Sequence, residues 1–230
     1  MPDKKPKQPR KSPRQAAWEA AEVAYAQGVM HHTLGNKEAS LTALEKALSL
    51  KADYPPAVLT MASIEYQLNK QDEGKERLFS LLKLPRSTED LPTIIDEAGS
   101  FLISIGAFGD GLEFYRKAAK RFPEIPAFHQ GIGCCAGQEG LFDDALEASR
   151  KAIDLDPGNA AYISDMGWTL VLAERFGEAE ATFKRALEID PSNERAQMNL
   201  QYCREQLSLA PPNPTEKPAA PPKKRKPRRS

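Results

Sequence analysis

The sequence predicts an all-α solenoid of about five stacked helix pairs followed by a capping helix. Two observations lead to this prediction. A skeleton of small and apolar residues recurs in steps of about 34 residues, a period typical of paired-helix repeats. Within each step, apolar residues follow the i, i+3, i+4, i+7 spacing of a helix with one buried face.

The clearest unit covers residues 160–193. Its second helix is expected to end at Asp190-Pro191, because proline cannot continue a helix. Its skeleton is Ile163, Met166, Gly167, Leu170, Ala179, Phe183 and Ala186. Counting backwards predicts four further units, with the residues Glu89 to Leu91 inserted before the third of the five. These units are residues 21–54, 55–88, 92–125 and 126–159.

The skeleton has a physical reason. A small residue at the eighth place, such as Gly167, and another at the twentieth, such as Ala179, let two antiparallel helices approach closely. Larger side chains at the fourth, seventh, eleventh and twenty-fourth places then fill the space between the helices.

The predicted solenoid covers residues 12–209. Ser12-Pro13-Arg14-Gln15 forms a capping box that begins the first helix. Residues 194–209 form a terminal capping helix, which a solenoid needs because its last repeat otherwise exposes a stacking face. Residues 1–11 and 210–230 are rich in Pro, Lys and Arg with little to bury, and we expect both to be disordered.

Charge is divided unevenly along the chain. The whole sequence has 32 basic and 32 acidic residues, but the two ends are basic and the body between them carries a net charge of about −10. The strongest basic cluster in the tail consists of Lys223, Lys224, Arg225, Lys226, Arg228 and Arg229. This cluster fits contact with nucleic acid, nuclear import, an acidic lipid or protein, the acidic body of the chain itself, or a solubilising role.

The three cysteines include no C-x-x-C pair, and the basic start is not followed by an apolar signal segment. We therefore expect a reducing, cytoplasmic location, with the nucleus as an alternative in a eukaryote. No window approaches the roughly 18 apolar residues of a membrane-spanning helix.

The repeat skeleton resembles the tetratricopeptide repeat (TPR) family over residues 21–193. The usual tryptophan at the fourth place and tyrosine at the eleventh are missing, and other core residues replace them. The resemblance implies a right-handed superhelix whose first helices line a concave groove that holds a peptide or helix. It places these residues along the groove: Tyr25, Val29, His32, Leu59, Ser63, Tyr66, Asp96, Ser100, Ile103, Gln130, Cys134, Gly137, Ser164, Asp165, Trp168 and Leu172.

The expected groove has an apolar floor with two acidic points, Asp96 and Asp165. It lacks the Lys and Asn residues with which some members of the family grip an acidic C-terminus. We expect a partner segment with aliphatic anchors and a Lys or Arg, and Trp168 is the strongest candidate contact. In the alternative, the C-terminal helix folds back and buries Trp168.

Other chemistry finds little support in the sequence. His31-His32 and the His129, Cys134 pair lack the further ligands of a zinc site, and Cys134 has no base on its own helix face. Cys135 falls on a small, buried place of its unit. We expect no enzyme activity, metal or cofactor.

Basic pairs recur on the second helices at Arg116-Lys117, Arg150-Lys151 and Lys184-Arg185. Glutamates three or four residues earlier favour ordinary surface ion pairs over a phosphate-binding ladder. The sequence therefore predicts a protein-binding adaptor, scaffold or chaperone-like module. The alternative is a nucleic-acid-associated factor that uses its basic tails for nucleic acid and its solenoid to recruit a partner.

Overall fold

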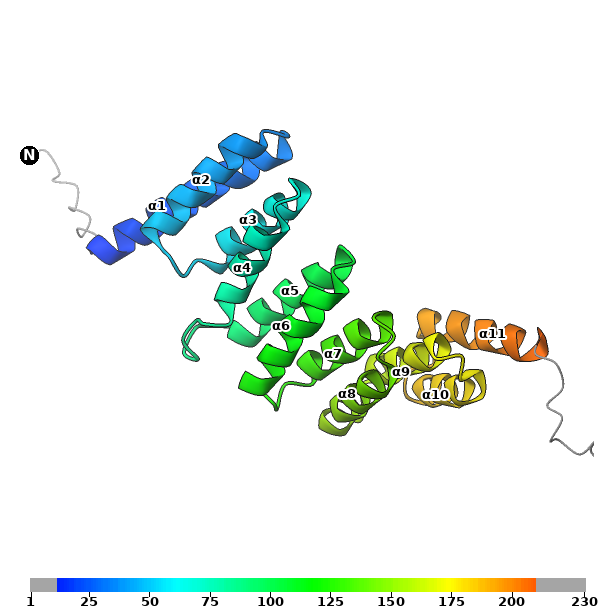
Figure 1. Ribbon diagram of the computed structural model, residues 1–230. Helices are drawn as coiled ribbons and strands as arrows, with labels where there is room; N and C mark the ends of the chain where they lie inside the picture. Colours follow the sequence, from blue (N-terminus) through cyan, green and yellow to red (C-terminus); the bar gives the residue numbers. More distant parts are fainter. Residues whose placement is uncertain (1–11, 210–230) are drawn as a thin grey trace, which may run out of the picture.

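The computed structural model describes residues 12–209, which form eleven α-helices and no strands (Figure 1). Ten helices form five pairs that stack along one axis, and the last helix follows the fifth pair. The helices are α1 (Pro13–Thr33), α2 (Lys37–Leu50), α3 (Pro55–Gln67), α4 (Gln71–Leu81), α5 (Leu91–Ser104), α6 (Phe108–Arg121), α7 (Pro126–Gln138), α8 (Phe142–Leu155), α9 (Ala160–Leu172), α10 (Phe176–Ile189) and α11 (Glu194–Leu209). The predicted all-α solenoid is confirmed.

Helix starts follow the chemistry of the sequence. The Ser12 hydroxyl accepts a hydrogen bond from the Gln15 backbone N–H at 3.2 Å, which caps α1. Prolines occupy the first turn of α1, α3, α5 and α7, where the missing N–H has no helical partner to lose.

The turn inside each pair repeats one backbone geometry. A residue with positive φ follows the first helix of every pair, at Gly35, Asn69, Gly106, Gly140 and Glu174. Glycine and asparagine adopt this conformation readily, whereas Glu174 adopts it at a cost of about 1 kcal/mol. The repeat therefore extends to the turns as well as to the core.

The odd-numbered helices form the inner row of the solenoid. Each of them contacts the next odd-numbered helix, from α1 to α11, whereas successive even-numbered helices make few contacts with one another. This asymmetry curves the stack, because the inner row is packed more closely than the outer one.

Small residues bring the helices of a pair together, as the sequence predicts. A Cβ atom on Gly28 would lie 2.6 Å from Leu44 Cγ, and one on Gly167 would lie 2.7 Å from the Phe183 ring. In the third pair, the ring of Tyr115 fills the space between Gly99 of α5 and Gly131 of α7.

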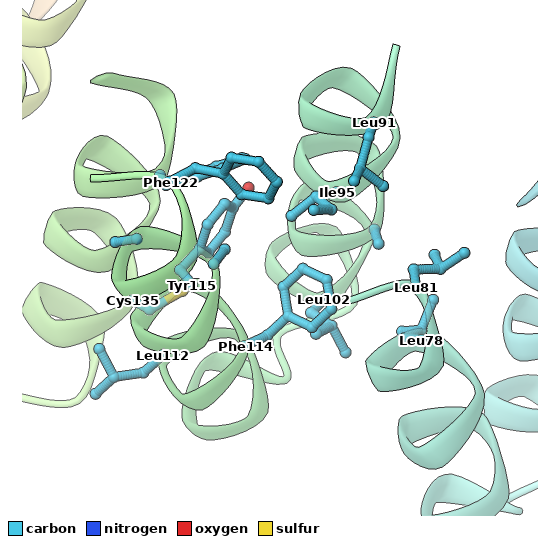
Figure 2. Packing of buried hydrophobic residues seen from close by; sticks show 14 of the residues in the cluster. Leu78, Leu81, Leu91, Ile95, Leu102, Leu112, Phe114, Tyr115, Phe122 and Cys135 are labelled. Atoms are coloured by element: carbon cyan, nitrogen blue, oxygen red, sulfur yellow. The ribbon is translucent and has the colours of Figure 1, made fainter. Parts of the chain in front are cut away.

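The largest apolar cluster runs from α3 to α8. Figure 2 shows Leu78 and Leu81 of α4 together with Leu102 of α5, and beside them Tyr115 of α6 and Cys135 of α7. Cys135 is fully buried, as expected from its place in the unit. Separate clusters join α1, α2 and α3 at one end and α8 to α11 at the other.

One buried ion pair replaces apolar packing in the second pair. Glu65 occupies the eleventh place of its unit, its side chain is only 7% exposed, and it accepts three hydrogen bonds of 2.6–3.0 Å from Arg77. Both carboxylate oxygens of Glu65 are thus paired with the guanidinium.

The connection between α4 and α5 departs from the regular repeat. It runs over residues 82–90, whereas the next connection between pairs covers only residues 122–125. Arg121 of α6 donates hydrogen bonds to the carbonyls of Leu82 and Leu84, and Arg86 reaches back to the Arg121 carbonyl. These contacts fix the long connection against the third pair.

Among the described helices, none has the length and apolar character needed to cross a membrane.

Candidate functional site

The inner row of odd-numbered helices carries the residues that the sequence predicts for a groove. Trp168 is 38% exposed and Val29 is 37% exposed, while Ser100 also faces solvent. Gly137 and Ser164 are buried and offer no surface to a partner. The other predicted groove residues are half-buried: Tyr25, His32, Leu59, Ser63, Tyr66, Asp96, Ile103, Gln130, Cys134, Asp165 and Leu172.

A cavity of about 970 Å³ lies where α1, α3 and α5 begin, and we call it the N-terminal pocket. Helices α1, α3 and α5, the short connection before α3 and the long connection before α5 all contribute to its wall. Its apolar lining is Trp18, Tyr25, Tyr54, Pro55, Pro56, Leu59, Pro85 and Ile94, and its charged lining is Lys51, Asp53, Glu89, Asp90 and Glu97.

Aromatic rings dominate one wall of the N-terminal pocket. Tyr25 and Tyr54 meet edge to face with ring centroids 5.5 Å apart, and Trp18 remains 44% exposed. The ammonium group of Lys51 lies 5.2 Å from the centroid of the Tyr54 ring. Burial raises the pKa of Tyr54, and the nearby charge of Glu22 adds to this effect.

A second cavity, about 540 Å³, lies between the second and third pairs, and we call it the central pocket. Tyr66 stands in its wall against Phe101, with ring centroids 5.7 Å apart. The Tyr66 hydroxyl donates to Asp110 at 3.3 Å. Burial and the Asp110 charge raise the pKa of Tyr66 to about 12.

Of the two carboxylates that line the central pocket, Asp110 and Glu139, Asp110 is already paired. Lys75 contacts Asp110 at 2.7 Å and Glu113 at 2.8 Å, and Lys117 also contacts Glu113 at 2.7 Å. These partners lower the pKa of Glu113 to about 2, the hydrogen bond from Lys117 being the largest cause. A basic partner would therefore have to compete with Lys75 here.

The two acidic points expected in the groove also have partners within the chain. The buried hydroxyl of Tyr115 donates to Asp96 Oδ1 at 3.1 Å. Asp165 accepts from Gln130 Nε2 at 2.8 Å and lies 3.1 Å from Arg195 Nη2. Burial raises the pKa of both carboxyls even so.

Trp168 of α9 lies beside the last helix. Its ring centroid is 6.5 Å from that of Tyr202 on α11, and Tyr202 is itself 42% exposed. The last helix thus lies beside Trp168 without burying it, since 38% of the residue remains exposed. Together the two rings form an accessible apolar patch at the C-terminal end of the inner row, which we call the C-terminal aromatic pair.

Half of the residues in the basic pairs of the second helices form ion pairs on the outer row. Lys117 pairs with Glu113 and Lys184 with Glu180, each one helical turn apart, while Arg116 reaches Asp144 of the next unit. The expected pairs with a glutamate one turn earlier are therefore confirmed at Lys117 and Lys184, whereas Arg150, Lys151 and Arg185 make no ion pair within residues 12–209.

Nucleophile and metal chemistry find no assembled group in the part of the chain that the structure describes. Burial raises the pKa of the Cys134 thiol, which keeps it protonated and a poor nucleophile. No cluster of three or more His, Cys, Asp or Glu side chains in residues 12–209 is placed to hold a metal ion. The basic tail cluster at residues 223–229 lies outside the described residues.

Several residues of these surfaces were not found from the sequence. Trp18 precedes the first unit at the start of α1, and Tyr202 follows the last unit on α11. Tyr54 and Ile94 lie beside the expected groove places rather than on them. The inserted residues Glu89 to Leu91 were the one available signal, because insertions in repeat proteins map to loops on one face.

Comparison with known families and structures identifies the repeats. Family models described as tetratricopeptide repeat match residues 21–54, 102–160 and 138–201. No curated protein matches the sequence at a significant level.

Solved structures share the fold at low sequence identity. YrrB, described as a TPR protein with an unusual peptide-binding site, is 19% identical with a TM-score of 0.54, over 82% of this chain and 99% of that one. A thermophilic TPR protein of Thermus thermophilus, TTC0263, is 21% identical with a TM-score of 0.51, over 81% and 100%. MamA from Desulfovibrio magneticus RS-1 is 19% identical with a TM-score of 0.52, over 76% and 97%.

The matched segments cover most of the first pair and the chain from the end of α5 into α11, and the stack of helix pairs is the one found in these solved proteins. The chain therefore belongs to the tetratricopeptide repeat family.

Proposed function

We propose that this protein is a non-enzymatic adaptor or scaffold that binds a peptide or helix of a partner protein along its inner row. The TPR fold supports a protein–protein interaction module in general. The observation that carries the proposal is the C-terminal aromatic pair, because Trp168 and Tyr202 lie close together on the inner row and both stay open to solvent, at 38% and 42% exposure. Exposed tryptophan and tyrosine are the residues most enriched at binding hot spots.

The contact chemistry suits a segment with apolar anchors. The half-buried Leu172 and the rings of Trp168 and Tyr202 offer an apolar surface, while Asp165 is partly neutralised by Arg195. A partner therefore gains from burying an aliphatic or aromatic side chain here more than from adding a cation. In a chaperone-like role, the same surface would bind apolar side chains from several client proteins.

Three free cysteines support action in a reducing compartment, and we propose the cytoplasm. The raised pKa of the Cys134 thiol supports a role other than nucleophilic catalysis. The nucleic-acid alternative depends mainly on tails outside the described residues, and on the outer row Arg116, Lys117 and Lys184 are already held in ion pairs.

The experiment compares Trp168→Ala with Ile189→Ala. Ile189 lies on α10 of the outer row and is 43% exposed, so it matches Trp168 in exposure but not in position. Partners recovered by the full chain are identified by mass spectrometry, and the affinity of each is measured by calorimetry. We expect Trp168→Ala to weaken binding about 30-fold, as for a hot spot worth about 2 kcal/mol, and Ile189→Ala to leave it unchanged.

Tyr66 needs a milder change than Trp168, because its ring packs over Gly74 and Phe101. Tyr66→Phe keeps this packing and removes only the hydroxyl.

Equal affinity of the Trp168→Ala variant and the parent for every recovered partner would refute the proposal.

A further inference from the structure

We propose that the N-terminal pocket is a binding site for a peptide rich in proline and lysine or arginine, and that the N-terminal arm of the same molecule, residues 1–11, occupies it. This site lies at the opposite end of the inner row from the C-terminal aromatic pair. The inference therefore stands whether or not the proposed partner binding is correct.

The apolar wall of the pocket suits proline. Trp18, Tyr25 and Tyr54 come from α1 and the connection before α3, and Leu59 and Ile94 continue the apolar surface towards α5. Proline-rich segments dock on aromatic-lined grooves because their backbone is already restricted and loses little entropy on binding. A cavity of about 970 Å³ that leaves Trp18 44% exposed has room for such a segment.

The charged wall suits lysine and arginine. Within residues 12–209, the carboxylates of Asp53, Glu89, Asp90 and Glu97 make no hydrogen bond or ion pair. They differ in this from the two acidic points expected elsewhere on the inner row, because Asp96 accepts a hydrogen bond from Tyr115 and Asp165 is paired with Arg195. Four carboxylates around one cavity, against the single cation of Lys51, create a net negative potential that attracts a basic segment.

The pocket already shows how a cation binds there. Lys51 places its ammonium group 5.2 Å from the centre of the Tyr54 ring, a distance typical of a cation–π contact. A lysine or arginine of an incoming segment has the free Trp18 ring available for the same contact.

The N-terminal arm has the composition and the position to be this segment. It carries Lys4, Lys5, Lys7, Arg10 and Lys11 against the single acid Asp3, with prolines at residues 2, 6 and 9. It joins α1 at Pro13, little more than one helical turn before Trp18 in the pocket wall. A short tether of this kind gives an effective concentration in the millimolar range, so weak contacts suffice to fill the pocket.

The arm is also long enough. Eleven extended residues span at most about 36 Å. The distance from α1 past α3 to α5 is two helix spacings of about 10 Å each. The arm can therefore reach from the aromatic wall to the carboxylates of Glu89 and Glu97 on the far side.

The test uses the fluorescence of Trp18 in the full chain. The sequence has only two tryptophans, so Trp168→Phe leaves Trp18 as the single reporter. Quenching by acrylamide, a neutral molecule, measures how much of Trp18 is covered. We expect quenching to rise when Lys4, Lys5, Lys7, Arg10 and Lys11 are all changed to Gln, and also when the parent is moved to about 0.5 M salt, which screens charges beyond about 4 Å.

The decisive variant changes the far wall. It combines Glu89→Gln, Asp90→Asn and Glu97→Gln. These three residues lie across the pocket from Trp18, so the variant changes the quenching of Trp18 only if a bound segment bridges the two walls. We expect this variant to raise quenching as much as neutralising the arm does. A matched control removes three exposed carboxylates from the outer row by Glu147→Gln, Asp154→Asn and Glu188→Gln, and we expect it to change nothing.

Three results would overturn the inference. If quenching of Trp18 is the same in the parent, the arm variant and the far-wall variant, the pocket is open. Quenching that instead responds to Gln at Lys223, Lys224, Arg225, Lys226, Arg228 and Arg229 means that the C-terminal tail is the occupant. Protection that grows with protein concentration means that the arm comes from a second copy.

Discussion

The close approach of helices in the third pair makes a quantitative prediction about Gly99. A Cβ atom at this position would lie 2.3 Å from Cζ of Tyr115, more than 1 Å inside an ordinary carbon–carbon contact of about 3.5 Å. Tyr115 is 1% exposed and has little room to move, because Gly131 of α7 also lies against its ring: a Cβ atom on Gly131 would be 2.5 Å from Cε2. Gly99→Ala therefore forces an overpacked core.

The expected magnitude follows from two opposing effects. Overpacking a buried site costs about 1–3 kcal/mol. Alanine in place of glycine within a helix returns about 0.5–1 kcal/mol. We expect Gly99→Ala to lower the free energy of unfolding by about 1–2 kcal/mol, measured by urea denaturation followed by circular dichroism.

A matched substitution in an open position has the opposite sign. A Cβ atom on Gly177 of α10 would meet no other part of the chain within 4 Å, so Gly177→Ala should raise stability by up to about 1 kcal/mol. A double-mutant cycle isolates the clash: in a Tyr115→Leu background, where the ring is gone, Gly99→Ala should cost much less. If Gly99→Ala costs nothing, or costs the same in both backgrounds, the packing argument is wrong.

Two further predictions concern the buried polar groups. Arg77→Ala leaves the Glu65 carboxylate buried without its partner and should lower the free energy of unfolding by about 2–3 kcal/mol, somewhat less than for a fully buried pair because Arg77 is 28% exposed. Arg116→Ala, which breaks only an exposed pair with Asp144, should change it by less than about 1 kcal/mol in the same urea assay, and equal effects would contradict this. Burial raises the pKa values of Tyr66 and Tyr115 above the usual 10.0, so the folded chain keeps phenolic protons that the unfolded chain releases. Stability should therefore be fully present below pH 10 and fall as the pH rises towards about 12, and a Tyr66→Phe variant should show a shallower fall in urea midpoint against pH.

The fold could be predicted from the sequence because small and large residues recur at fixed places in each unit. Gly28, Gly99 and Gly167 recur at the place where a first helix meets its partner, and the structure puts a large side chain of the second helix against each of them. Replacing the usual tryptophan and tyrosine did not hide the pattern, because close packing depends on the small places more than on the identity of the large ones.

The state of the polar groups could not be predicted in the same way. Asp96 and Asp165 fall on groove places by counting, yet Tyr115 and Arg195 are their partners in the folded chain. Arg195 belongs to the last helix, outside the repeat, so no count within a unit connects it with Asp165. The repeat period predicts which backbone position a residue occupies. It does not predict the hydrogen-bond or ion-pair partner of the side chain, because that partner can come from outside the repeat units.

The N-terminal pocket exists because the repeat is broken there. In a regular unit a short connection leads directly from one pair to the next, as residues 122–125 do between α6 and α7. Between α4 and α5 the chain instead runs over residues 82–90, and Pro85, Glu89 and Asp90 from this stretch line the cavity. Arg121 and Arg86 hold the longer connection in place, so it forms a wall rather than a loose loop. The insertion therefore adds a rigid surface bearing two of the four free carboxylates at one end of a row that is otherwise uniform. In a family that builds binding surfaces from identical units, such an interruption is what gives one position along the row a chemistry of its own.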